Sequence, residues 1–76
     1  MAAITRGGEK VRFKAAYGYG GARLKGAYRV DLGGRTLGWV ERRTVDGRWL
    51  AGAFGGGYVP GAFATRADAA VVLLFV

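Results

Sequence analysis

Residues 27–43 read AYRVDLGGRTLGWVERR, and the pattern of this segment predicts a β-hairpin. Apolar and polar side chains alternate in its first half, AYRVDL, as they do in a strand that buries one face. Gly33-Gly34 then suits the tight two-residue turn that closes a hairpin. Residues 35–43 are therefore predicted to return as a second strand, antiparallel to the first.

The sequence on both sides of this hairpin predicts further strands. An Asp-Gly turn at 45–47 precedes residues 48–54, RWLAGAF, which predict a third strand of the same sheet. Residues 58–63 can add a short strand, but Pro60 cannot donate to a ladder and confines that strand to an edge. Residues 10–16, KVRFKAA, alternate basic and apolar side chains and predict a half-buried strand near the start of the chain.

The end of the chain carries a helix signal. Thr65 is a typical N-cap, and Asp68 three residues later completes a capping box. The helix is predicted to begin at Arg66 or Ala67 and to run through the apolar residues 69–76. The apolar positions cover more than one stripe, so the helix is sandwiched or shared with a partner. The predicted fold class is α+β: a small antiparallel sheet of three to four strands with one C-terminal helix packed on one face.

The charge of the chain is high and unevenly placed. Its 76 residues hold 12 Lys and Arg against 5 Asp and Glu, a net charge of +7. Residues 1–29 contain seven of the cations and one acid, whereas residues 30–76 contain five cations and four acids. This asymmetry predicts a basic, glycine-rich N-terminal arm over 1–26, with a strand in it, joined to a folded module over 27–76. The alternative is a basic segment that is merely solvated.

The residue inventory argues against catalysis. The chain has no cysteine and no histidine, which removes disulfides, thiolate chemistry, the usual zinc sites and imidazole acid–base catalysis. The five carboxylates are isolated from one another in sequence and are interpreted as surface ion pairs, turn formers or caps. We therefore expect no enzymatic activity, no catalytic residues, no cofactor and no metal.

The apolar segments are too short for a membrane protein. The longest apolar run, residues 69–76, is far below the roughly 18 to 20 residues that a spanning helix needs. The first residues lack the apolar core of a secretory signal. Membrane-surface binding ranks last among the functions considered, because the predicted helix carries Arg66 as its only cation. We expect a cytoplasmic protein without a membrane partner.

Basic arms of this kind commonly follow phosphate backbones, so DNA is the expected partner. The phosphate-binding candidates of the arm are Lys10, Arg12, Lys14, Arg23 and Lys25.

Residues 17–26, YGYGGARLKG, favour a turn or irregular loop because of their glycine density. Tyr17 and Tyr19, together with Tyr28, could stack on exposed bases, which leaves RNA open as well as DNA. The alternative is a loop whose tyrosines fold back on the core.

The order of the elements is itself informative. A GRW-bearing strand, a glycine turn, a short strand ending in GAF and a helix that opens TRADAA follow one another. This order resembles the three-stranded sheet and C-terminal helix of the plant ethylene-response-factor type of DNA-binding domain and of the arm-binding N-terminal domains of phage integrases. The resemblance covers residues 35–75. The matching residues are Gly47, Arg48, Trp49, Ala51, Gly61, Phe63, Thr65, Ala67, Ala69 and Ala70.

The resemblance implies that the sheet lies in the DNA major groove, which is wide enough to admit strands. It adds four nucleic-acid-binding candidates from the sheet: Arg35, Arg42, Arg43 and Arg48. Trp39 or Trp49 would contact a sugar or a thymine methyl group, while at least one of these two tryptophans belongs to the core. Residues 50–54, LAGAF, depart from the charged pattern of the relatives, which weakens base readout and leaves more of the binding to the arm.

Two functions follow. The first is a small DNA-binding regulator of the phage or mobile-element type that contacts phosphates and the groove through sheet arginines and the basic arm. The alternative is a protein-interaction module, an adaptor or inhibitor that docks an acidic host protein through Leu73 to Val76 and the glycine-rich loops. The apolar end LLFV also fits a homodimer formed through the C-terminal helix.

Overall fold

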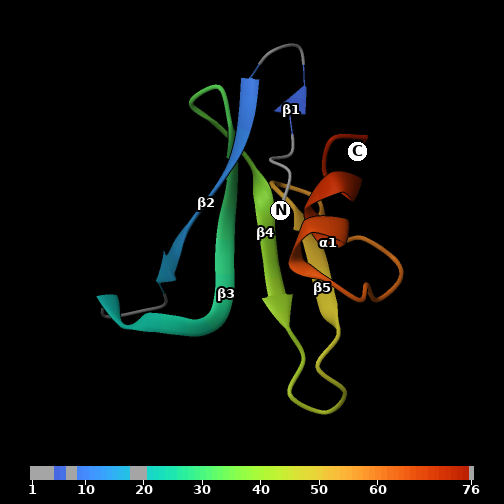
Figure 1. Cartoon of the computed structure of the whole chain (residues 1–76). Helices are drawn as coiled ribbons and strands as arrows, with labels where there is room; N and C mark the ends of the chain where they lie inside the picture. The colour runs from blue at the N-terminus through green and yellow to red at the C-terminus, as the bar shows by residue number, and fades with distance from the viewer. Residues whose placement is uncertain (1–4, 7–8, 18–20, 76) are drawn as a thin grey trace.

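Six antiparallel strands pair in chain order within the described part of the molecule, and one helix follows them. Figure 1 shows this computed structural model, which describes residues 5–6, 9–17 and 21–75. The elements are β1 (Thr5–Arg6), β2 (Glu9–Tyr17), β3 (Arg23–Leu32), β4 (Arg35–Arg42), β5 (Trp49–Ala53), β6 (Gly57–Tyr58) and α1 (Arg66–Val72).

The predicted α+β class, with one C-terminal helix on one face of an antiparallel sheet, is confirmed. The described sheet has more strands than the three to four predicted, because β2 belongs to it and two-residue strands lie at both edges. β2 pairs with β3 from Val11↔Leu32 to Ala15↔Tyr28. The predicted boundary at residue 26 therefore falls inside β3, and residues 23–26, expected in a loop, are strand.

The hairpin of β3 and β4 forms as the sequence predicts. Gly33 and Gly34 both have positive φ, 58° and 78°, which a two-residue turn of this type requires. The register then shifts, because Val30 faces Gly38 while the next residue of β3, Asp31, faces Thr36. The extra residue in β4 is Leu37, and this bulge lets its side chain pack against the core.

Helix α1 packs on β4 and β5, whereas β2 and the first part of β3 extend away from it (Figure 1). Ala51 of β5 and Ala69 and Ala70 of α1 are all fully buried, so three methyl groups set the spacing between helix and sheet. Val30 and Val40 are the largest fully buried side chains of the described residues. Each such valine contributes about 1.5 to 3 kcal/mol when it leaves water.

An aromatic cluster closes the core beside the start of the helix. The rings of Phe13 and Tyr28 meet edge to face with centroids 6.4 Å apart, and Trp49 lies 6.1 Å from Tyr28. Arg66 covers the cluster, with its guanidinium carbon 4.2 Å from the centroid of Phe13 and 4.8 Å from that of Tyr28. Trp49 is thus the tryptophan that packs against the core, as expected of one of the two.

The helix is shorter than predicted. The backbone N–H groups of Leu73, Leu74 and Phe75 bond to carbonyls three residues earlier, which tightens the last turn after Val72. This turn carries Leu73 and Leu74 into the core.

The expectation that residues 73–76 form a contact surface or dimer interface is therefore wrong for Leu73 and Leu74, whose side chains are used within the chain. Phe75 is 82% exposed, and Val76 lies outside the described residues.

The strand expected over residues 58–63 is also shorter. β6 ends at Tyr58, before Pro60, which cannot donate a ladder hydrogen bond. Phe63 instead makes an isolated antiparallel bridge to Trp49, with both N–H···O distances at 2.8 Å.

Within residues 5–6, 9–17 and 21–75, no helix is long and apolar enough to cross a membrane.

The N-cap of α1 provides a test of the fold. The Thr65 hydroxyl oxygen accepts a hydrogen bond from the backbone N–H of Asp68 at 3.1 Å. Thr65→Ala is predicted to lower the free energy of unfolding by about 1 kcal/mol, because that N–H loses its partner. Thr65→Ser keeps the oxygen and is the matched control. Urea denaturation followed by circular dichroism measures both, and equal stability of Thr65→Ala and wild type would contradict the cap's role.

Candidate nucleic-acid interface

The sheet face opposite α1 carries a cross-strand row of residues. The registers place Lys14 beside Arg29, Arg29 beside Trp39, and then Gly52 and Tyr58 in succession across β2 to β6. We call this the open face. Its residues alternate along the strands with side chains of the core, such as Val30 and Val40, which explains why they point away from the helix.

Three predicted phosphate-binding residues lie along β2 on the open face. Lys10, Arg12 and Lys14 alternate with Val11 and Phe13 of the core, and all three are exposed. Residues two apart on a strand are about 6.6 to 6.8 Å apart. The structure therefore sets out three positive charges at regular intervals along one edge of the face.

A buried carboxylate lies beside this row. Asp31 is 5% exposed and accepts two hydrogen bonds from Arg29, through Nε and Nη2, each at 3.1 Å. Lys14 Nζ lies 3.4 Å from its Oδ2. Burial raises the pKa of Asp31, but hydrogen bonds from Arg29, Thr36 and Lys14 and the charge of Arg29 together hold it below its ordinary value. The carboxylate stays ionised and fixes Lys14 and Arg29 on the face.

Trp39 lies further along the same face. Its six-membered ring covers the Cα of Gly52, where any Cβ would overlap the ring. Tyr58 meets the ring edge to face, with centroids 5.9 Å apart and planes at 76°. The Tyr58 hydroxyl donates a hydrogen bond to Glu41, which raises the pKa of Tyr58. These contacts hold the indole in one position on the surface.

A groove of about 450 Å³ runs along Trp39 on the open face. Trp39, Tyr17 and Phe54 supply its aromatic walls, and Arg29 and Thr36 supply its polar groups. Tyr17 is 63% exposed and Phe54 is 73% exposed. Trp39 and Tyr17 were sequence candidates, but Arg29 and Phe54 were not. Arg29 lies on the polar face that the alternation of residues 27–32 predicts, and the register of β2 with β3 places it beside Lys14.

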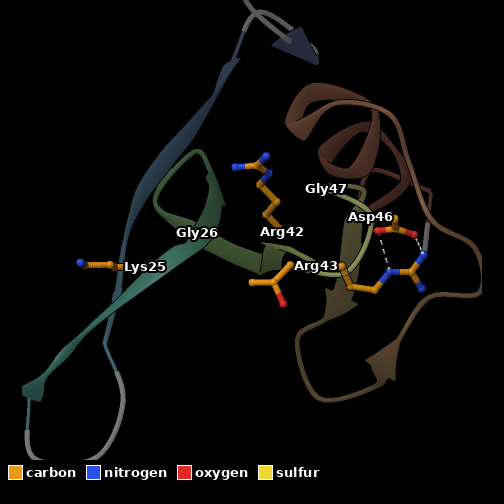
Figure 2. Close-up of a pocket in the computed structure, with 7 residues that line it drawn as sticks. Lys25, Gly26, Arg42, Arg43, Asp46 and Gly47 are labelled. Atoms are coloured by element: carbon orange, nitrogen blue, oxygen red, sulfur yellow. Dashed lines mark hydrogen bonds and ion pairs between the residues drawn. The ribbon is translucent and has the colours of Figure 1, made fainter.

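A second hollow, of about 480 Å³, gathers three more of the predicted residues: Lys25, Arg42 and Arg43. It lies where β3 begins, where β4 ends and at the turn that follows β4. Figure 2 shows Lys25 and Arg42 pointing in different directions, whereas Arg43 turns toward Asp46. The hollow is thus lined by three cations whose side chains do not converge on one point.

Arg43 is tied to its own turn. Its Nε lies 3.1 Å from Oδ1 of Asp46, and its Nη2 bonds the other carboxylate oxygen. Asp46 also accepts the backbone N–H of Arg48 at 3.0 Å. These hydrogen bonds, that from Arg43 first, lower the pKa of Asp46, and the bond to Asp46 raises the pKa of Arg43. Among the described side chains, none forms an ion pair with Lys25 or Arg42.

The nine predicted candidates do not form one surface. Arg42 alternates with Val40 and pairs with Trp49, so it lies on the helix side of the sheet, away from Trp39. Arg35 is exposed at the β3–β4 hairpin, and Arg48 is exposed beside the 43–48 turn.

Two of the sequence candidates cannot be placed. The side chain of Arg23 and all of Tyr19 lie outside the described residues. A single row of sheet arginines sharing a face with Trp39 does not form among the residues that the structure describes.

Comparison with known proteins gives no relative. No family model, no curated protein and no solved structure matches this chain. The similarity to ethylene-response-factor and phage integrase domains therefore rests on the sequence pattern of residues 35–75 alone and stays a prediction. The candidate interface is defined by the geometry of the open face and of the second hollow.

Asp31 gives this arrangement a pH signature. Asp31→Asn is predicted to lower the free energy of unfolding at pH 7 by about 1.5 to 3 kcal/mol, because it removes hydrogen bonds between charged groups. The pKa of Asp31 is lowered by folding, so the stabilisation is fully present above about pH 4 and is lost as the pH falls through the folded-state pKa.

The difference between wild type and Asp31→Asn is therefore expected to be largest near pH 7 and to shrink below pH 4 in urea denaturation curves. Asp46→Asn removes an exposed ion pair and is the control, with a smaller effect on stability. A difference for Asp31→Asn that is the same at pH 7 and pH 3 would contradict the ionised, paired state of this carboxylate.

Proposed function

We propose that the chain binds DNA, through contacts of its cations with phosphates. The observation that carries the proposal is the row of Lys10, Arg12 and Lys14 on the exposed side of β2, continued across the sheet by Arg29. A net charge of +7 on 8.0 kDa adds long-range attraction for a polyanion.

The second hollow supports the same proposal. Lys25 and Arg42 are exposed and pair with no described carboxylate, so they remain available to phosphates. Arg43 is less available, because Asp46 already offsets its charge. Lys14 and Arg29 share the charge of Asp31, which leaves Lys10 and Arg12 as the cations of the β2 row without an ion pair to a described residue. The proposal therefore gives most of the phosphate binding to the β2 row and a smaller share to Lys25 and Arg42.

The biological role belongs to the same proposal. A small DNA-binding regulator that acts in the cytoplasm, of the phage or mobile-element type, is the role that the resemblance of residues 35–75 implies. A homodimer formed through α1 would place the exposed side chains of Val71 and Phe75 at its interface, because Leu73 and Leu74 are buried within the chain.

Neutralising the β2 row tests the proposal. Lys10→Gln combined with Arg12→Gln is predicted to weaken binding to a mixed-sequence DNA duplex and to lower the slope of log K against log salt by about two, because two phosphate contacts are lost. Fluorescence anisotropy at several salt concentrations measures both quantities.

The matched control is Arg35→Gln combined with Arg48→Gln, which removes the same charge from exposed positions outside the β2 row. An equal loss in both double variants would show that net charge alone acts and that the β2 row is not the site. Equal affinity of the wild type for DNA and for poly-glutamate would contradict DNA binding and favour the acidic-protein alternative.

A further inference from the structure

We propose that the Trp39 groove holds an unpaired base, so that the protein binds single-stranded DNA in preference to duplex DNA. This inference rests on the proposed DNA-binding function and assigns it a ligand form and a second set of residues. The β2 row would contact phosphates, and the groove beside it would take the bases.

The aromatic side chains of the groove support base stacking. Tyr17 from the end of β2, Trp39 from β4 and Phe54, which directly follows β5, meet around one hollow on the surface. Tyr17 and Phe54 are largely exposed, although exposed aromatic rings leave favourable burial unused. Every base has a π face, so stacking on such rings binds single strands with little regard to sequence.

The indole is organised in advance for stacking. Gly52 leaves room for the ring of Trp39 to lie on the sheet. Tyr58 borders the same ring on the side toward β6, away from Arg29. Because Trp39 already occupies one fixed position, a base that stacks on it costs little side-chain entropy. A volume of about 450 Å³ is in the range of sites that hold small flat ligands.

Charge beside the groove favours a nucleotide over an uncharged ligand. Arg29 lines the groove and is the cross-strand neighbour of both Trp39 and Lys14. The phosphate of a nucleotide whose base contacts Trp39 would lie near these two cations and near Arg12. A duplex keeps its base faces stacked inside and cannot use the groove without unpairing.

The same charges argue against a second copy of this chain as the occupant. Two open faces packed against each other would bring Arg12, Lys14 and Arg29 of both copies together, and like charges in contact are unfavourable. The described acids of the face, Asp31 and Glu41, offset only part of this charge, because the face also carries Lys10 and so sets four cations against two carboxylates.

Fluorescence anisotropy with labelled oligo-dT and with a mixed-sequence duplex of equal length tests the inference. Wild type is expected to bind oligo-dT more tightly than the duplex. Trp39→Ala is expected to weaken oligo-dT binding by roughly 5- to 100-fold, the loss of one stacked base, with less than about a twofold change for the duplex. Trp39→Phe keeps an aromatic face and is expected to retain most of the affinity.

Phe54→Ala gives an independent reading, because Phe54 is 73% exposed and its loss does not endanger folding. It is expected to weaken oligo-dT binding selectively, whereas Phe75→Ala, the loss of an exposed ring outside the groove, is expected to change neither affinity. Oligo-U of the same length is the RNA comparison.

The outcomes separate the two proposals. Unchanged oligo-dT affinity in Trp39→Ala and Phe54→Ala, with duplex binding intact, would overturn the groove inference and leave DNA binding standing. Absence of binding to both nucleic acids would overturn both. Tighter binding of oligo-U than of oligo-dT, or Trp39-dependent binding of poly-glutamate, would assign the groove to RNA or to an acidic peptide and would also overturn the inference.

Discussion

The close packing of α1 on β4 and β5 is the interaction on which the rest of the structure depends. Ala51, Ala69 and Ala70 are fully buried at this contact, and the small side chains let the helix lie close to the sheet. This seven-residue helix packs on β4 and β5 from one side of the sheet. The opposite face has to remain stable in water, which explains its cations, its buried ion pair and its glycines beside Trp39.

The open face combines stability with available charge. Asp31 takes a carboxylate out of water and holds Arg29 and Lys14 with it, so part of the positive charge is fixed in position and not left on freely moving side chains. Arg12 adds a cation that no described carboxylate pairs with. The open face thus carries a defined pattern of charges and one held aromatic ring, which suits the polyanion proposed as its partner.

The sequence predicted the elements of the fold better than the site. Alternation in residues 27–43, the glycine turn at 33–34 and the Thr65 cap are local signals, and each formed as expected. The membership of β2 in the sheet and the inward turn of Leu73 and Leu74 depend on tertiary packing, which local patterns do not report. The site was harder because the faces of separate strands become neighbours only through register, and the bulge beside Asp31 changes that register.

The most direct test of the account uses the two tryptophans, which lie on opposite faces of the sheet. Each gives one indole N–H signal in a proton–nitrogen correlation spectrum, and Trp39→Phe assigns them. Adding oligo-dT is predicted to shift the Trp39 signal and to leave that of Trp49, packed against the core, nearly unchanged. A shift of Trp49 together with the α1 amides, and none at Trp39, would contradict the account by placing the binding surface on the helix side.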